Sequence, residues 1–490
     1  MNNAVVLPLL IPLLTGVTLI FFANVRAQRT IAAVGALLNV VAAAYVVQQV
    51  RVEGIQTLYM GGWLPPFGIV FVADMLAALL ALTAAVIMAA CLFYAFRTIG
   101  EGRERHHFYA FAQFLAVGVI GSFLTGDIFN LFVCFEVMLI SSYALIVLGG
   151  EKRQLRESIK YILINIVSSV LFVATMAYLY AALGTLNMAQ LAERVAEAGQ
   201  GGVLNVVAVL LLVVFALKAG LFLFFWLPGS YGAPPPVVAA MFGGLLTKVG
   251  VYAIVRTFTL IFTQDPGFTQ PIIGWMSAGA MLLGAIGAVA YRDVPRILIY
   301  NIVVAVGFVG FGVSAATEAA LDGVVFYLLH DMVAKALIFL LGGWLIAIAG
   351  TTKLSEMGGW IEKAPALGWM TLATGVAIAG VPPLSGFVGK LLVVQGGLEA
   401  GRYAMTAVAL AASLLVLLSM MRLFMGAFWG EPAAERPRAE ARGLLAPCAA
   451  LLAIVVLLGV GAEWANGYVS LAGDVLANPS VYIDAVLKGD

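Results

Sequence analysis

The amino-acid sequence predicts an all-α polytopic membrane protein of about fourteen transmembrane helices, forming a single bundle over residues 1–490. Composition is the first observation: 63% of the residues are hydrophobic and 10% are charged, whereas soluble domains are roughly 45–50% apolar and about 25% charged. Apolar runs of about twenty residues also recur along the whole chain, and each can cross a hydrocarbon core of ~30 Å. Finally, Lys and Arg concentrate in alternate loops, as they do in helical membrane proteins.

The apolar runs define the individual helices. They lack the residue-by-residue alternation of barrel strands, so a membrane β-barrel is excluded. The first run is too long for the apolar region of a signal peptide and has no basic residue before it, so we expect it to be retained as the first helix. The predicted spans are 4–23, 30–49, 69–96, 108–125, 127–149, 158–184, 203–228, 236–258, 270–291, 296–316, 321–350, 366–398, 404–427 and 443–463.

The loops between these spans predict the orientation. One set of alternate loops carries 17 basic residues: Arg26, Arg29, Arg97, Arg103, Arg105, Lys152, Arg153, Arg156, Lys160, Arg292, Arg296, Lys353, Lys363, Arg422, Arg436, Arg438 and Arg442. The other set carries 5: Arg51, Arg194, Arg256, Arg402 and Lys488. Basic loops stay on the cytoplasmic side of a cell membrane. We therefore expect an even number of helices and both termini on the outer side.

Several classes of protein are excluded by composition. The formal net charge is +1, which gives no basic surface for nucleic acid. Cys91, Cys134 and Cys448 all lie in apolar stretches without C-x-x-C spacing, and the chain has only 3 His. We therefore expect no disulfide, no iron–sulfur cluster, no haem and no metal or other cofactor bound by this chain.

A few ionisable residues lie deep inside the apolar runs. Each costs about 2.5–3.5 kcal/mol on insertion scales, so such residues pair with one another, line water, or carry function. They occupy the fifth, seventh, eighth, eleventh and twelfth spans: Glu136, Lys218, Lys248, His330, Asp331, Lys335 and Lys390.

Packing alone is one interpretation of these charges, but it predicts balanced signs. Four buried Lys instead face chiefly Glu136 and Asp331. Burial and like charge both disfavour an ammonium group, and a nearby carboxylate reverses that effect. Movement of Glu136 relative to Lys218 would therefore switch a lysine between holding and releasing a proton. This set of residues predicts a carrier of protons or other cations.

The eleventh span allows two readings. Asp331 and Lys335 are four residues apart with the acid first, which suits a neutral ion pair on one helix face. His330 is then the group that titrates near neutral pH. A lone intramembrane His is often only a hydrogen-bonding residue, but beside this lysine series we favour a proton relay.

Two of the apolar runs are interrupted. Gly380-Val-Pro-Pro-Leu-Ser-Gly386 breaks the twelfth run just before Lys390, and Ala219-Gly220 follows Lys218 in the seventh. Irregular backbone at membrane depth is tolerated where it is buried in protein or lines water. Broken helices five spans apart predict an inverted repeat of helices 4–8 and 9–13, over about 108–258 and 270–427.

Four segments of the sequence carry a recognisable pattern: Phe135-Glu-Val-Met-Leu-Ile-Ser-Ser-Tyr143, Lys218-Ala-Gly-Leu-Phe with Trp226-Leu-Pro228, Ala233-Pro-Pro-Pro-Val with Gly244-Leu-Leu-Thr-Lys248-Val-Gly-Val-Tyr-Ala, and Gly380-Val-Pro-Pro-Leu-Ser-Gly-Phe with Lys390. Together they resemble a known family: the antiporter-like subunits shared by Mrp-type sodium/proton antiporters, respiratory complex I and membrane-bound hydrogenases. The resemblance covers roughly residues 69–430. The chain length and the His330-Asp-Met-Val-Ala-Lys335 run resemble the D-type subunits of Mrp antiporters.

The resemblance implies a role for each matching residue. Glu136 and Lys218 would form the coupling pair, Lys248 the central relay, and Lys390 the terminal site, with His330 in the eleventh helix. It implies a proton-translocating subunit of a multisubunit Na⁺/H⁺ antiporter in the cell membrane, surrounded by lipid and other membrane subunits, with protons and Na⁺ as substrates. Such a chain is a secondary transporter subunit and not itself an enzyme.

Three other functions remain to be weighed. The same fold serves as a proton-pumping subunit of a complex I-like NADH:quinone oxidoreductase or a hydrogenase, and companion chains with iron–sulfur or flavin groups would favour that reading. A stand-alone transporter would need a polar substrate cavity, of which the sequence offers little. A structural scaffold would have no use for unpaired buried lysines.

Overall fold

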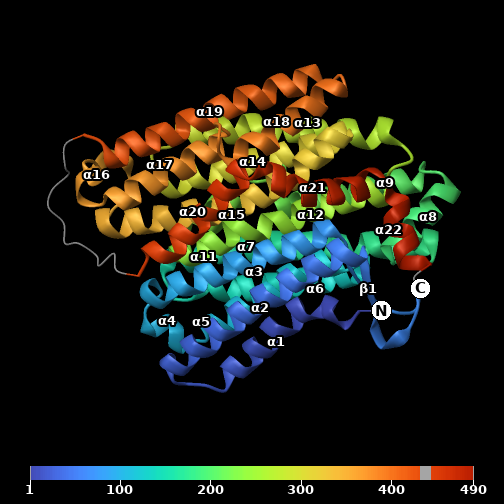
Figure 1. Cartoon of the computed structure of the whole chain (residues 1–490), viewed down its shortest axis with the longest axis horizontal. Helices are drawn as coiled ribbons and strands as arrows, with labels where there is room; N and C mark the ends of the chain where they lie inside the picture. The colour runs from blue at the N-terminus through green and yellow to red at the C-terminus, as the bar shows by residue number, and fades with distance from the viewer. Residues whose placement is uncertain (1, 431–442, 489–490) are drawn as a thin grey trace.

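The computed structural model describes residues 2–430 and 443–488, which form a bundle of long helices running nearly side by side (Figure 1). In this described part, ten helices are long and apolar enough to span a membrane, α20 and α21 form a further pair bent by 84°, and three shorter apolar helices complete the set. These segments fall one for one on the fourteen predicted spans. The chain is therefore an all-α multi-pass membrane protein, as predicted.

The first half of the chain contains η1 (Asn3–Val6), α1 (Leu7–Ile20), α2 (Val25–Glu53), α3 (Met75–Thr98), α4 (Glu101–Arg105), α5 (Phe108–Leu124), α6 (Ile128–Val147), α7 (Lys152–Leu183), α8 (Met188–Ala198), α9 (Val203–Ala219) and α10 (Leu227–Gly232). The eighth span is continuous, and it consists of α11 (Pro236–Met241), the π-helical turn η3 (Phe242–Leu246), α12 (Thr247–Arg256) and a second π turn, η4 (Thr257–Ile261). The second half contains α13 (Pro266–Ala290), α14 (Val294–Ala315), α15 (Glu318–Ala349), η5 (Leu354–Glu356), α16 (Trp360–Lys363), α17 (Pro365–Ala379), α18 (Ser385–Glu399), α19 (Tyr403–Phe428), α20 (Leu445–Val460), α21 (Ala462–Ala477) and α22 (Pro479–Leu487).

Some elements differ from the prediction. The last predicted span, 443–463, continues into α21 after a sharp bend. Outside the spans the chain also forms short structures that apolar runs do not reveal. These are helix α8, the C-terminal helix α22, and an antiparallel hairpin of β1 (Gln56–Tyr59) and β2 (Val70–Ala73), in which Gln56 pairs with Ala73. The short 3₁₀ turn η2 (Met60–Gly62) lies between its strands.

The two ends of the bundle are distinct. The N- and C-termini lie at one end, together with α8, α22 and the hairpin (Figure 1). Helices α4 and α16, which lie in the predicted basic loops, are at the opposite end (Figure 1). Both termini therefore share one side, as an even number of spans requires. The basic loop residues Arg436, Arg438 and Arg442 lie outside the described residues.

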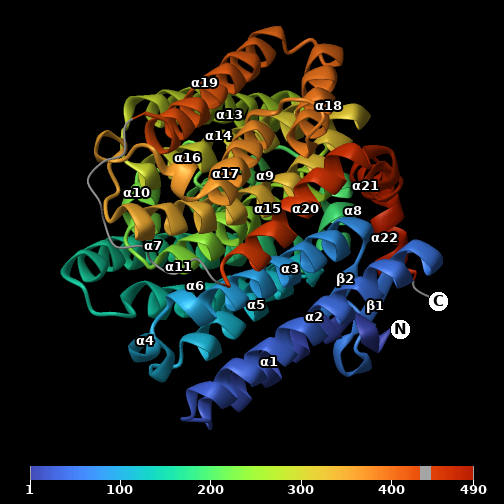
Figure 2. The same ribbon diagram turned by 60° about the vertical axis from the view of Figure 1, so that its left-hand side comes forward.

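The centre of the bundle is formed by the eighth span, α14 and α15. In the most apolar stretch of each segment, 100%, 94% and 89% of the residues are buried, respectively. Helices α1 and α2 form one edge of the molecule and α19 lies on the opposite side (Figure 2). Side chains of α15 and the eighth span are therefore shielded by protein on all sides, whereas those of α1, α2 and α7 mostly face outward.

The seventh and twelfth spans are interrupted, as predicted. Helix α9 ends at Ala219 and not at the predicted residue 228, and the following Gly220 has φ +74°. Helix α17 ends at Ala379, and Gly380 has φ +86°. Left-handed backbone of this kind suits glycine and stops a helix. The two breaks leave the last carbonyl groups of α9 and α17 without continuing helical hydrogen bonds.

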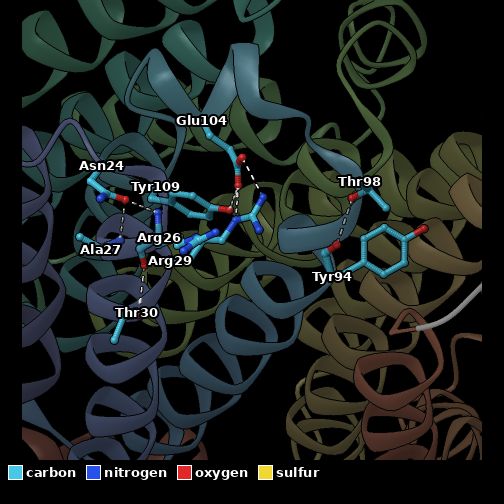
Figure 3. A network of polar contacts seen from close by, with 9 residues as sticks. All are labelled: Asn24, Arg26, Ala27, Arg29, Thr30, Tyr94, Thr98, Glu104 and Tyr109. Carbon is cyan, nitrogen blue, oxygen red and sulfur yellow. Dashed lines mark hydrogen bonds and ion pairs between the residues drawn. The ribbon is translucent and has the colours of Figure 1, made fainter.

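A buried polar cluster fixes the basic end of the bundle (Figure 3). The carboxylate of Glu104 in α4 is fully buried and accepts hydrogen bonds from Arg29 Nε at 2.7 Å and Nη2 at 2.9 Å. The hydroxyl of Tyr109 donates to the same carboxylate at 2.5 Å. Bidentate, charge-assisted bonds are the strong kind. They hold α2, α4 and α5 together.

A second buried ion pair fixes the opposite end. Asp74 Oδ2 lies 2.6 Å from Arg256 Nη2, and both side chains are almost fully buried. Asp74 Oδ1 also accepts a hydrogen bond from Ala77 N and so caps α3. The Arg256 guanidinium lies 4.8 Å from the centre of the Tyr482 ring in α22. The pair therefore joins the start of α3, the end of α12 and the C-terminal helix.

We expect Asp74→Asn to lower the thermal unfolding midpoint of the purified protein clearly. Asparagine caps helices as well as aspartate does, so any loss of stability comes from the missing charge and not from a missing cap. Breaking a buried ion pair costs about 3–5 kcal/mol. The measurement is the midpoint of heat-induced aggregation in detergent. Asp484→Asn removes an exposed pair with Lys488 and should leave the midpoint unchanged. An equal midpoint in the two variants would contradict a stabilising role for the Asp74–Arg256 ion pair.

Candidate functional site

The candidate site is a series of ionisable side chains within the membrane-spanning helices. Lys218, Lys248, His330, Lys335 and Lys390 are each between 1% and 7% exposed, while Glu136 is half-buried. The structure distributes them over α6, α9, α12, α15 and α18, and arranges them in three groups.

The first group contains Glu136 and Lys218, and a third residue joins them. Ser169 in α7 donates a hydrogen bond to Glu136 Oε1 at 2.5 Å. Lys218 Nζ donates to the same serine hydroxyl at 3.1 Å. Among the described residues the two charged groups make no direct ion pair with each other. The predicted coupling pair is thus brought together, but through the Ser169 hydroxyl.

The C-terminal end of α9 and an aromatic ring on α6 both stabilise the Lys218 ammonium at this depth. The residue lies in the last turn of α9, next to the break at Gly220, where the negative end of the helix dipole favours a cation. Its Nζ is also 5.8 Å from the centre of the Phe135 ring, within the range of a cation–π contact.

The second group surrounds Asp331 in the middle of α15. Lys248 Nζ lies 2.8 Å from Asp331 Oδ2, and Lys335 Nζ lies 3.5 Å from Asp331 Oδ1. One carboxylate therefore serves two lysines. The predicted Asp331–Lys335 pair exists, but the shorter contact is to Lys248 from a different helix.

The backbone around Lys248 is also unusual. The π-helical turn η3 ends just before α12, and Lys248 Nζ donates a hydrogen bond to the carbonyl of Gly243 within that turn at 2.8 Å. A π turn inserts one extra residue into a helix and occurs often at functional sites. It supplies Lys248 with an acceptor besides Asp331.

The third group joins α15 to the broken twelfth span. His330 Nδ1 is 2.7 Å from Ser385 Oγ, at the start of α18, and its Nε2 has no hydrogen-bond partner among the described residues. A Cβ on Gly386 would lie 1.9 Å from the Ala377 carbonyl and 2.8 Å from His330 Nε2. Glycine is therefore required for this close approach.

Lys390 completes the third group on α18. Its Nζ donates hydrogen bonds to the Ala379 carbonyl at 3.0 Å and to Ser413 Oγ at 3.3 Å, and lies 4.8 Å from the centre of the Phe308 ring. Ala379 is the last residue of α17. Each break therefore places a lysine at the C-terminal end of the helix that it interrupts.

Sequence reasoning missed the partners of these residues. Ser169, Ser385 and Ser413 are short hydroxyl residues in apolar helices, and such residues usually bond to their own backbone. The contact between Lys248 and Asp331 joins residues far apart in the chain. Among the described residues, no three His, Cys, Asp or Glu converge as a metal site.

Comparisons with known proteins identify the class. Residues 125–417 match the family described as NADH:quinone oxidoreductase/Mrp antiporter, transmembrane. The D-type subunit of the Na(+)/H(+) antiporter of Bacillus subtilis (strain 168) is 50% identical to this chain over 493 aligned residues, covering 100% of both chains. The chain therefore belongs to the NADH:quinone oxidoreductase/Mrp antiporter family of membrane subunits.

Solved structures show the same fold. A chain in the structure of the Mrp complex from Dietzia sp. DQ12-45-1b has a TM-score of 0.92 at 29% identity, covering 99% of this chain and 100% of that one. A chain of the membrane-bound sulfane sulfur reductase, an archaeal respiratory membrane complex, has a TM-score of 0.90 at 26% identity, covering 99% of both. The fold thus occurs in antiporter and respiratory assemblies alike.

Proposed function

We propose that this chain is the proton-translocating D-type subunit of a multisubunit Na⁺/H⁺ antiporter. The observation that carries the proposal is the cluster of Lys248, Asp331 and Lys335. With all three groups charged, the cluster holds one net positive charge in a buried site, which is costly. Release of one proton leaves it neutral. The cluster can therefore exist with either proton content, as a relay requires.

The other groups supply the two ends of the path. Glu136 and Lys218 form the coupling pair, because changing their separation changes how strongly the lysine holds its proton. His330 passes protons within α15 and toward α18, and Lys390 is the terminal site. Lys335 shares Asp331 with Lys248 and takes part in the same relay. The breaks beside Lys218 and Lys390 give backbone carbonyls and water a place at membrane depth.

The antiporter and Mrp-complex relatives described above also support a proposal for the complex in which the chain works. We infer that the chain works with other membrane subunits of a hetero-oligomeric complex, that protons and Na⁺ are the ions exchanged, and that it is a transporter subunit and not an enzyme. We place it in the cell membrane with both termini outside, because the basic loops lie at the end opposite the termini. The interrupted spans in corresponding positions favour inverted repeats over 108–258 and 270–427.

The second candidate is a proton-pumping subunit of a complex I-like oxidoreductase or hydrogenase. The likeness to the respiratory complex favours it, but at 26% identity, against 50% for the antiporter chain. The co-purifying subunits separate the two: small membrane proteins alone support the antiporter, while iron–sulfur or flavin chains would support the oxidoreductase.

Loss of the coupling pair tests the proposed function. We expect Glu136→Ala and Lys218→Ala each to abolish cation/proton exchange while the complex still assembles, because each variant removes a charge-bearing group but leaves the helix intact. The measurement is collapse of a pH gradient on Na⁺ addition in everted vesicles that contain the complete complex, with native-gel blots for assembly. Lys152→Ala and Glu197→Ala, both on exposed residues, should exchange normally. Substantial exchange in either coupling-pair variant would overturn the role.

A further inference from the structure

We propose that Ser169 is the proton-transferring and positioning hydroxyl between Lys218 and Glu136, an inference that rests on the proposed function and adds a third residue to its coupling pair. The serine is half-buried on α7, between α6 and α9. Its Oγ is the shared partner of the two charged side chains, at 2.5 Å from Glu136 Oε1 and 3.1 Å from Lys218 Nζ.

The hydrogen bonds around Ser169 differ from those of most hydroxyl groups in these helices, because they join two charged side chains. Ser122 and Thr175 donate to the carbonyl four residues earlier in their own helix, the usual arrangement. The adjacent Ser168 points to the Val214 carbonyl of α9 at 3.5 Å. Ser169 instead accepts from a lysine on one neighbouring helix and donates to a carboxylate on another. Hydrogen bonding to the backbone of its own helix does not explain these contacts.

The same geometry allows a balanced proton transfer. An Nζ–H bond of Lys218 breaks as a new O–H bond forms on Ser169 Oγ, and the proton already on Oγ passes to Glu136 Oε1. The ammonium and the carboxylate both become neutral, and the serine keeps one proton with its hydroxyl turned around. The reverse transfer restores the charged pair. No other reactant is needed.

Among the described residues, the Ser169 hydroxyl is the hydrogen-bond partner of the Lys218 ammonium. The Phe135 ring also lies against this ammonium, but an aromatic ring cannot accept and pass on a proton. No direct ion pair joins Glu136 and Lys218 among the described residues. Without the hydroxyl, transfer between the two would need a water molecule or a movement of α9 against α6.

Three substitutions at Ser169 test this role. Ser169→Ala removes the hydroxyl group. Ser169→Thr and Ser169→Val introduce side chains of nearly equal size, of which only threonine has a hydroxyl group. We expect the Ala and Val variants to exchange roughly tenfold more slowly or worse, because a hydrogen bond between charged groups is lost. The Thr variant should keep at least about half of the exchange rate. Ser168→Ala is the neighbouring control and should exchange normally.

The assay is Na⁺-driven proton exchange per assembled complex, measured alongside Glu136→Ala and Lys218→Ala. Normal exchange in Ser169→Ala, or equal losses in the Thr and Val variants, would overturn the proposal, since the first removes any need for the hydroxyl and the second indicates packing. If Glu136→Ala and Lys218→Ala lose exchange while Ser169→Ala does not, only the serine role fails. If all of these variants exchange normally, the proposed function fails with it.

Discussion

Replacement of Lys248 by arginine is expected to reduce cation/proton exchange by roughly a hundredfold or more, nearly as much as replacement by alanine, since general acid–base groups contribute on that scale. Lys248 holds the centre of the buried series, with Asp331 and the Gly243 carbonyl both 2.8 Å away. Arginine stays charged at any accessible pH. It would therefore keep the ion pair with Asp331 but could not release a proton to the next site.

The measurement is Na⁺-induced collapse of a pH gradient in everted vesicles, corrected for the amount of assembled complex. Lys152→Arg makes the same chemical change at an exposed lysine and should leave exchange intact. If Lys248→Arg exchanged at the wild-type rate, charge alone would be required at this position, and the relay through Lys248 would be wrong.

Replacement of Lys390 should separate proton transfer from packing at the far end of the series. Lys390→Leu is expected to abolish exchange, because leucine fills the space without any ionisable group. Lys390→Glu should keep part of it, since a carboxyl group in an apolar site holds its proton near neutral pH. In that protonated form it can donate to the Ala379 carbonyl, which now accepts from Lys390 Nζ at 3.0 Å.

Exchange measured over a series of pH values distinguishes the two Lys390 variants. Lys363→Leu, at an exposed lysine of α16, is the control for loss of a positive charge. Equal losses in the Leu and Glu variants, or full activity in the Leu variant, would remove Lys390 from the path and leave it a packing role.

Most of the fold followed from simple features of the sequence. Long apolar runs predict membrane spans because each crosses the hydrocarbon core with its own backbone hydrogen bonds satisfied. The two helix breaks were also visible, because a glycine follows Lys218 and Ala219 in the seventh span, and Gly380, Pro382 and Pro383 interrupt the twelfth. The predicted seventh span nevertheless ran on to residue 228, because apolar residues continue after α9 ends at Ala219. Helix α21 beyond the bend at Gly461 was not predicted, because Glu463 and Asn466 lower the hydropathy of that segment.

The candidate site was only partly predictable, for a different reason. Ionisable residues in apolar runs are conspicuous, so all seven of those residues were identified one by one. Their partners depend on helix packing, which brings the eighth span against α15 and packs α7 against both α6 and α9. Asp331 was assigned to Lys335 by its spacing of four residues, although Lys248 is closer to it in space. Ser169 gave no signal, since a serine in a membrane helix is common.

Protons are proposed to cross the membrane through this chain and not through a companion subunit. Reconstitution of the purified complete complex carrying Lys248→Arg into proteoliposomes, with proton and Na⁺ fluxes followed together, tests this path. We expect an intact set of subunits, normal liposome tightness, and loss of both fluxes, since exchange couples one to the other. Undiminished proton flux through an assembled Lys248→Arg complex would place the proton path in another subunit.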